Sequence, residues 1–101
     1  MSNLQTANTI LAQLGGKRFV VMTGAKNFVG SADSLGFSLP ARFAKGGINK
    51  VRVTLTPDDL YTVEFFKLRG VDIRVIAQVE GIYADQLQSA FTEATGLDTR
   101  F

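Results

Sequence analysis

The sequence contains neither cysteine nor histidine among its 101 residues. Without cysteine the chain cannot form a disulfide, a thiolate metal site, a redox pair or a cysteine nucleophile. Without histidine it also lacks a common zinc ligand, the base of Ser-His nucleophile pairs and the side chain best suited to proton transfer near neutral pH. Oxygen-ligand metals such as magnesium or calcium, and carboxylate or lysine chemistry, are the classes that stay open.

Membrane-spanning and secretory signals are also missing. No apolar run approaches the roughly 20 residues that a membrane span needs, and residues 1–5 do not combine a charged segment with an apolar core. The sequence therefore predicts no membrane partner and a cytoplasmic location. A hydrophobic content of 46% with 20% charged residues is ordinary for a globular protein. We expect a single domain over residues 1–101, because this length suits one hydrophobic core.

A nucleotide-binding loop is absent too, although the stretch MTGAKNFVGSADSLGF, residues 22–37, is rich in glycine. A Walker loop places Gly-Lys-Ser or Gly-Lys-Thr directly before a helix, whose first amides hold the phosphates. Here Gly-Ala-Lys at 24–26 precedes Gly-Ser at 30–31, so the order is reversed, and no helical pattern follows. The dinucleotide pattern G-x-G-x-x-G is missing as well.

The surrounding segment, residues 24–47, is long for a connection in so small a domain. It is either a flexible, partly cationic arm or a partly regular structure that the sequence does not resolve. Its aromatic residues either pin it onto the sheet, which is the ordinary use of a phenylalanine, or offer stacking surfaces to bases. These residues are Phe28, Phe37 and Phe43.

The carboxylates do not form a recognisable catalytic set. Asp58 and Asp59 directly follow a proline, a position where aspartates bond their own backbone and form turns. Glu64 is the other candidate, but the pattern places no acid, base and nucleophile together. The sequence therefore predicts a non-enzymatic protein with no catalytic residue, no cofactor and no resident metal.

Apolar periodicity predicts a helix over residues 3–14, which Gly15-Gly16 then ends with a left-handed stop. The buried face of this helix consists of Leu4, Ala7, Leu11 and Leu14. The next stretch, KRFVVMT at Lys17–Thr23, has a central apolar run and predicts a strand. Alternating apolar residues at 35, 37 and 39 predict a short strand before Pro40.

Three further strands and a helix follow. Residues 49–56 alternate apolar with polar side chains, and a Thr-Pro-Asp-Asp turn joins them to residues 60–69 in a hairpin. A third antiparallel strand is predicted over residues 72–81. Residues 83–97 predict a second amphipathic helix, which Gly96 ends. The predicted fold class is α+β, a twisted antiparallel sheet of four to five strands with an N-terminal and a C-terminal helix on one face. The other face stays open.

The charge is uneven along the chain, although its net value is only +2. Residues 1–54 carry seven basic residues against one acidic residue, whereas residues 55–101 carry four against eight. The cationic half predicts an anionic partner, with nucleic acid as the leading hypothesis. The candidate contacts are Lys17, Arg18, Lys26, Arg42, Lys45, Lys50 and Arg52. The alternative is that these charges only keep a small domain soluble.

A face of the sheet offers a second argument for nucleic acid. Lys50 and Arg52 share one face of a predicted strand, and Arg74 could join them if the register allows. Aromatic residues lie on the strand between, either Tyr61 and Phe65 or Phe66. A basic, aromatic sheet face is how several single-strand binders stack bases and neutralise phosphates. A plain solvated face explains the same pattern.

Four stretches resemble a family of small proteins encoded by bacteriophages, prophages and conjugative elements. They are TGAKNF at 23–28, LGFSLP at 35–40, INKVRVTLTPDDLYTVEF at 48–65 and EGIYADQLQSAFTEATGL at 80–97. The resemblance implies a bacterial cytoplasm and supplies no site residues. It suggests a DNA-associated accessory protein or a small inhibitor of a host defence system.

The rival hypothesis is therefore a protein-protein module, either such an inhibitor or a homo-oligomer that pairs through an edge strand. The working surface of an inhibitor would be an acidic helix face that imitates the charge of DNA. This face would consist of Asp85, Glu93 and Asp98.

Overall fold

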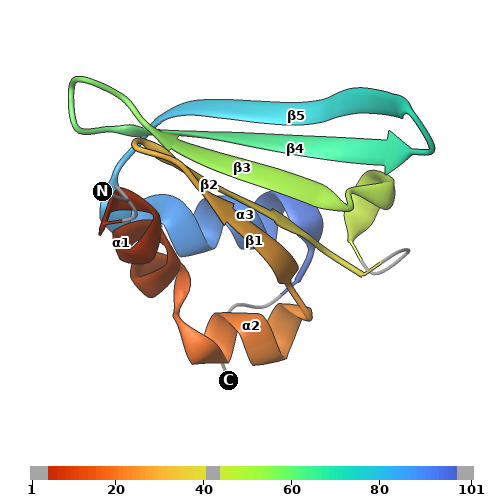
Figure 1. Ribbon diagram of the computed structural model, residues 1–101, viewed down its shortest axis with the longest axis horizontal. Coiled ribbons are helices and arrows are strands. Elements are labelled where there is room, and N and C mark those ends of the chain that lie inside the picture. Colours follow the sequence, from red (N-terminus) through yellow and green to blue (C-terminus); the bar gives the residue numbers. More distant parts are fainter. Residues whose placement is uncertain (1–4, 41–43, 98–101) are drawn as a thin grey trace.

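The computed structural model describes residues 5–40 and 44–97. Its elements are α1 (Gln5–Leu14), α2 (Lys17–Thr23), β1 (Lys26–Gly30), β2 (Ser34–Ser38), the 3-10 helix η1 (Lys45–Gly47), β3 (Lys50–Leu55), β4 (Tyr61–Arg69), β5 (Asp72–Ile82), the 3-10 helix η2 (Ala84–Gln86) and α3 (Leu87–Thr95). The strands form one antiparallel sheet in the order β1-β2-β3-β4-β5. The helices pack against one face of this sheet (Figure 1), which confirms the predicted α+β class.

The first helix forms as predicted, but Leu11 of its predicted buried face is only partly buried and Ile10 is fully buried instead. Ala7, Ile10 and Leu14 are buried on one face of α1, at the spacing of an amphipathic helix. The helix ends at the two glycines, where the Gly16 amide donates a hydrogen bond to the Leu11 carbonyl over 2.9 Å. Leu4, the first residue of the predicted stripe, lies outside the described residues.

The prediction of a strand at Lys17–Thr23 is wrong, because these residues form helix α2. Only Phe19 and Thr23 of this helix are buried, one helical turn apart, while Val21 is 70% exposed. In a strand Val21 would share the buried face of Phe19 and Thr23, because alternate residues lie on one face, but Val21 is exposed. The packing of Phe19 therefore outweighs the strand preference of the valines, as tertiary contacts often outweigh propensity.

The same pattern, Phe-x-x-x-Thr-Gly, ends both α2 and α3. Each buried threonine donates its hydroxyl to the phenylalanine carbonyl one turn earlier, Thr23 over 2.7 Å and Thr95 over 2.8 Å. Each also accepts the amide two residues later, from Ala25 and Leu97. The glycine between them adopts the left-handed conformation at both ends, with φ of 71° and 75°. Both helices thus stop where the chain must turn.

Aromatic rings join the helices to the sheet at the centre of the core. The ring centroid of Phe19 lies 5.2 Å from that of Phe37 on β2 and 5.1 Å from that of Phe91 on α3, both edge to face. Phe65 on β4 completes this cluster, 6.4 Å from Phe91. One core therefore contacts α2, α3 and the central strands.

Most of the segment 24–47 is regular structure, and its described part is not a flexible arm. β1 and β2 form a hairpin, closed where the Ser31 amide donates to the Ser34 carbonyl over 2.9 Å. Phe37 is buried and the Phe28 ring lies 5.5 Å from it, so these two aromatics pin the segment onto the core. Phe43 lies outside the described residues.

The central strands alternate as the sequence predicts. On β3, Val51 and Val53 are buried whereas Lys50 and Arg52 are exposed. The second face of the sheet is therefore free of helices, and we call it the open face.

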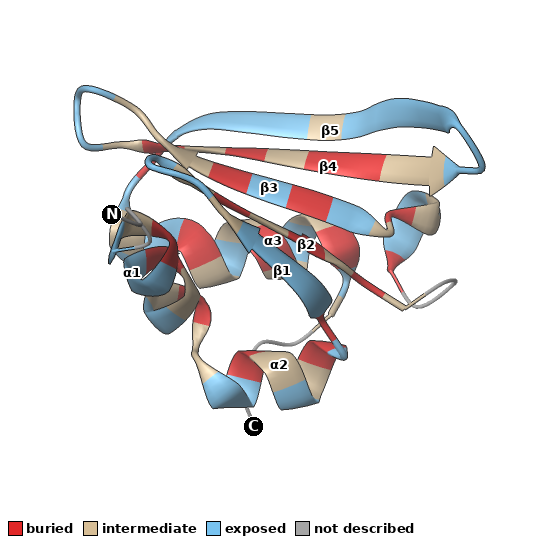
Figure 2. Ribbon diagram, in the orientation of Figure 1, coloured by how far each residue is buried: buried red, intermediate tan, exposed pale blue. Residues whose placement is uncertain are grey.

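The last strand differs from the others because little of it is buried. Along its 11 residues β5 buries only Ile82, and Figure 2 shows it exposed over nearly its full length. Its register against β4 shifts twice, opposite Tyr61/Val63 and opposite Phe65/Phe66. Regular pairing holds over residues 72–75 and 77–79. β5 is thus a long edge strand that keeps apolar side chains in solvent.

Within the described parts of the chain, no helix is long and apolar enough to cross a membrane.

Candidate nucleic-acid interface

The open face of the sheet is organised in rows that cross the strands. Because directly paired residues share a face, the pairings of Ser38 with Lys26 and with Lys50, and of Lys50 with Phe66, place these side chains side by side. Val75 of β5 extends this row. Two lysines therefore flank a serine in one line, next to an aromatic ring.

The next row centres on an arginine held in place from two sides. Arg52 donates its Nε to Oε1 of Glu64 over 3.1 Å, and its guanidinium carbon lies 5.5 Å from the centroid of the Phe66 ring. The Arg52 side chain is still 52% exposed. Among the described residues no other hydrogen bond of this guanidinium is formed, so its terminal nitrogens face solvent. The pair neutralises Glu64, the carboxylate that would otherwise repel a phosphate.

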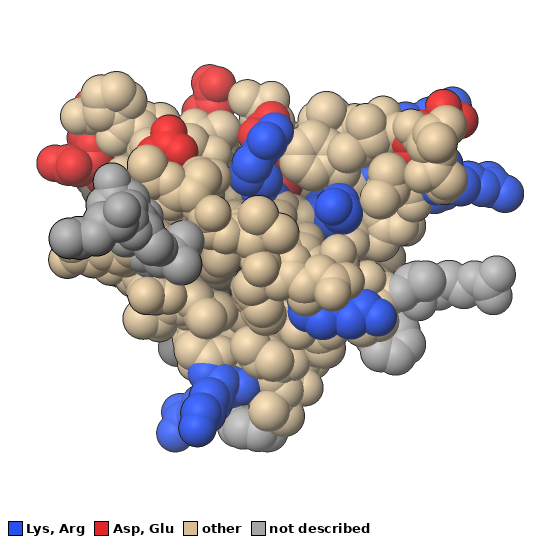
Figure 3. All heavy atoms as spheres, in the orientation of Figure 1, with Lys and Arg blue, Asp and Glu red and all other residues tan. Residues whose placement is uncertain are grey.

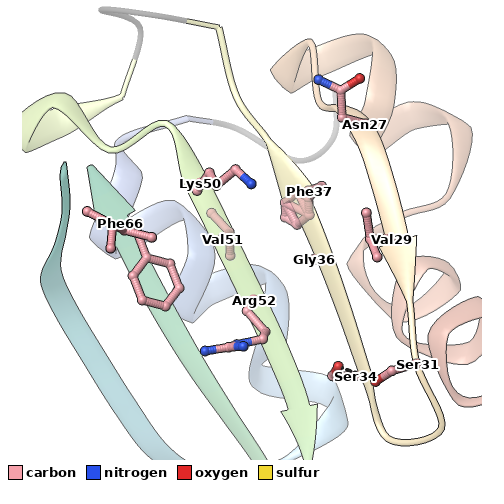
Figure 4. A pocket seen from close by; sticks show the side chains of 11 residues that line it. Asn27, Val29, Ser31, Ser34, Gly36, Phe37, Lys50, Val51, Arg52 and Phe66 are labelled. Carbon is pink, nitrogen blue, oxygen red and sulfur yellow. Dashed lines mark hydrogen bonds between the residues drawn. The ribbon is translucent and has the colours of Figure 1, made fainter. Parts of the chain in front are cut away.

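A groove of about 610 Å³ follows the Arg52 row and reaches Lys50 and Phe66 of the first row. Figure 4 shows Arg52 and Phe66 meeting at one side of it, from β3 and β4, with Val29 of β1 opposite. Gly36 lies between them on β2, and because glycine has no side chain the groove is deeper at this position. Hydroxyl groups line the end of the groove at the β1–β2 turn, where Ser31 and Ser34 are hydrogen-bonded over 2.6 Å.

In the folded chain, acidic and basic residues lie at opposite ends of the strands. This separation does not follow the two halves of the sequence. The turns β1–β2 and β3–β4 and the end of β5 form an acidic end, which contains Asp33, Asp58, Asp59, Glu80 and Asp85. The opposite ends of the strands, with η1, form a basic end, which contains Lys26, Lys45, Lys50, Lys67, Arg69 and Arg74 together with one carboxylate, Asp72. Figure 3 shows acidic atoms mainly on the left of the view and a group of basic atoms on the right, near the β4–β5 turn of Figure 1.

Two cations of the basic end, Lys67 and Arg69, were not among the predicted contacts, and Arg74 was expected only on the face of Lys50 and Arg52. Lys67, Arg69 and Arg74 line a hollow of about 370 Å³ with Asp72 at the β4–β5 turn. Lys67 pairs with Arg74, and Arg69 with Asp72. The signal in the sequence was the hairpin itself, because antiparallel pairing around Gly70 brings cations on both strands together.

The predicted contacts divide into two groups. Lys26, Lys50 and Arg52 come together on the open face. Lys17 and Arg18 are exposed on α2, on the helix side of the sheet, where Figure 3 shows a separate basic group at the lower left. The Lys45 side chain lies against Gly96 at the end of α3, where a cation is favourable beside the helix carbonyls. Arg42 lies outside the described residues.

The register also settles the expectations for the aromatic residues and Arg74. Tyr61 and Phe65 are buried in the core, and Phe66 is the aromatic residue on the open face. Arg74 does not join Lys50 and Arg52 there, because it pairs with Lys67, which lies beside Gly47 on the other side of β4.

The remaining carboxylates have structural explanations or stand alone. Thr56 donates its hydroxyl to the Asp58 carboxylate and to the Leu60 carbonyl, so the Asp58-Asp59 pair belongs to the β3–β4 turn, as predicted. Glu93 is exposed on α3, apart from Asp85 in η2, and Asp98 lies outside the described residues. No group of three carboxylates that could hold a metal ion occurs in the described chain.

Comparisons with protein-family models, with curated proteins and with solved structures gave no match to this chain, so the site is interpreted from its own geometry.

Proposed function

We propose that the protein binds single-stranded nucleic acid across the open face of its sheet, towards the basic end. The observation that carries the proposal is the row of Lys26, Ser38 and Lys50 beside the Arg52 groove. Two ammonium groups and a hydroxyl suit the oxygens of a phosphodiester backbone. The groove next to them has an apolar floor and a flat cation, which suits a base.

Arg52 is the residue best placed to contact a base. Glu64 and the Phe66 ring fix its guanidinium plane from two sides while half of the side chain stays exposed. A guanidinium plane stacks on bases as aromatic side chains do. Since Glu64 and Phe66 already hold it, little rotamer freedom is lost when a base arrives.

The row of Lys26, Ser38 and Lys50 and the β4–β5 turn favour the binding of a single-stranded nucleic acid over a duplex. Over the residues that the structure describes, the open face is a sheet surface with a groove, and it presents no helix that could enter the major groove of DNA. Bases of a single strand are free to turn towards Arg52 while their phosphates follow the lysines. The hollow of Lys67, Arg69 and Arg74 continues the basic surface around the hairpin and extends the path of the backbone.

The resemblance to bacteriophage and mobile-element proteins gives this activity a setting. In our proposal the chain is a non-enzymatic accessory protein that handles nucleic acid in the cytoplasm of a bacterial host. Its partner is then the single-stranded form of the element's DNA, or an RNA.

Fluorescence anisotropy with labelled single-stranded DNA, double-stranded DNA and RNA tests the proposal directly. We expect binding to a single strand that weakens steeply between low and moderate salt, because neutralised phosphates release counterions. Tighter binding to the duplex than to either single strand would contradict the proposal. So would the absence of salt-sensitive binding to all three.

The double variant Lys26→Ala/Lys50→Ala tests the site. Removing two phosphate contacts should weaken binding at least about tenfold and lower the slope of log affinity against log salt by about 1.4, which is about 0.7 per contact on a single strand. Lys17→Ala/Arg18→Ala is the matched control, because it removes two exposed cations from α2 and leaves the open face intact. Equal losses in both double variants would show a diffuse charge effect instead of this site.

A further inference from the structure

We propose that two copies of the chain pair antiparallel through their β5 strands and form one continuous sheet. This interaction does not depend on the proposed nucleic-acid binding. The free edge of each β5 thus pairs with the β5 edge of a second copy of the same chain. The midpoints of the two strands, near Ala77, lie side by side.

The two edges of the sheet are built differently. β1 has only five residues, begins with Lys26, and carries an irregularity between Lys26 and Val29, where Asn27 has a φ of 57°. Short length, a charge and a bulge are common ways to prevent an edge strand from pairing. β5 has 11 residues and pairs regularly with β4 over residues 72–75 and 77–79. Its outer backbone groups are therefore the longest free row of donors and acceptors in the sheet.

Apolar side chains remain exposed along this edge on both faces. Ile73 and Val75 are 56% and 57% exposed on the open face, and Ile76 and Val79 are 41% and 38% exposed further along the strand. Gly46 of η1 lies beside Ile76, so that side chain is covered only from one side. A strand added beside β5 would cover these four side chains from the edge side, which is favourable in proportion to the apolar area buried.

The charge distribution favours pairing with a second copy whose β5 runs antiparallel. β5 begins in the basic end, where Lys67, Arg69 and Arg74 outnumber its own Asp72, and it finishes in the acidic end with Glu80. Antiparallel pairing places the Arg74 end of one strand opposite the Glu80 end of the other, and it does so twice because of the two-fold symmetry. Parallel pairing would bring basic ends together and acidic ends together. Complementary potentials of this kind set the orientation of partners.

Sedimentation of nucleic-acid-free protein tests the pairing with a single variant. We expect the wild type to show a concentration-dependent monomer–dimer equilibrium with a dissociation constant on the order of micromolar, because a pairing of this size is a small interface. Val75→Lys places a charge in the seam of each copy and should weaken the dimer at least about tenfold. Val21→Lys is the matched control, since Val21 is 70% exposed on α2, and it should leave the dimer unchanged.

Three outcomes would overturn the proposal. They are a wild type that stays monomeric up to about millimolar concentration, a Val75→Lys dimer as tight as the wild type, and an equal loss in Val21→Lys. Because the sample contains no nucleic acid, each of these outcomes is separate from the result of the anisotropy assay.

The absence of native cysteine allows a clean test of orientation. Gln78→Cys lies next to the proposed centre, so a short bismaleimide should link the two copies efficiently. Asp72→Cys lies near the strand end, and in the antiparallel pair its two thiols are about 33 Å apart at about 3.3 Å per residue, beyond the reach of the reagent. Equal cross-linking at both positions would indicate parallel pairing, and no cross-linking at Gln78→Cys would place the interface elsewhere.

Discussion

At the residue scale, the buried threonines are polar side chains whose hydrogen bonds are all local. Thr23 and Thr95 are 2% and 0% exposed, and each uses its hydroxyl as donor and acceptor within its own helix end. The hydroxyl therefore holds together the last turn and the exit of the chain. In the sequence the Phe-x-x-x-Thr-Gly pattern occurs at residues 19–24 and 91–96, but a helix end was predicted only at the second place, from Gly96 alone.

Replacing Thr23 with valine tests this local role. Thr23→Val keeps the shape but leaves the Phe19 carbonyl and the Ala25 amide without their partner, so we expect a loss of about 1–2 kcal/mol in the free energy of unfolding. Urea denaturation measures it. Thr92→Val is the control, because Thr92 is only partly buried on the same kind of helix. A stability equal to that of the wild type would show that the hydroxyl contributes nothing net.

At the element scale, strands β2 to β5 were predictable, whereas β1 and helix α2 were not. Residues 50–55 and 61–69 alternate or carry apolar runs between clear turn signals, so their local preference agrees with the fold. In α2 local preference and fold disagree. The run Phe19–Met22 is typical of a strand, and the helix forms because Phe19 reaches Phe37 and Phe91, residues far away in the sequence. No pattern within a short window contains that information.

Two glycine substitutions separate backbone strain from steric exclusion at the end of α2. Gly24 and Gly70 both have positive φ, 71° and 61°, so Gly24→Ala and Gly70→Ala should each cost about 1 kcal/mol in unfolding free energy. A Cβ at Gly24 would also lie 2.8 Å from Cγ of Pro40, whereas Gly70 has nothing within 4 Å. We therefore expect Gly24→Ala to be the more destabilising variant by at least about 1 kcal/mol in chemical denaturation. Equal losses would mean that Pro40 moves away freely.

At the scale of the whole molecule, folding rearranges the charge pattern. The sequence separates a basic half from an acidic half, but the meander of strands carries residues of both halves to each end of the sheet. Lys26 and Lys50 come from the first half, and Lys67 and Arg74 come from the second. The candidate site could therefore be predicted only in part: Lys50 and Arg52 share a strand face, whereas the neighbours of Phe66 depend on register, which bulges shift.

Hydrogen exchange tests the order of stability across the sheet. β3 and β4 have a strand on both sides and the core beneath them, so their amides should exchange most slowly. β1 is a short edge with exposed side chains and should exchange at least about tenfold faster, because local opening costs less free energy there. Amide exchange followed by NMR gives these rates for each residue. Equal protection of β1 and β3 would contradict this order.

The aromatic cluster also governs when the chain can fold during its synthesis. Phe91, against which Phe19 packs, is synthesised after all five strands, and the Leu14 carbonyl accepts a hydrogen bond from Gln88 over 3.1 Å. From β2 onwards, each strand pairs with the strand made just before it. On the ribosome the meander can therefore assemble strand by strand, and α1 and α2 can reach β2 at that stage, but their contacts with α3 form only after α3 is made. α1 and α2, which precede the strands in the chain, thus complete their packing only when α3 is present.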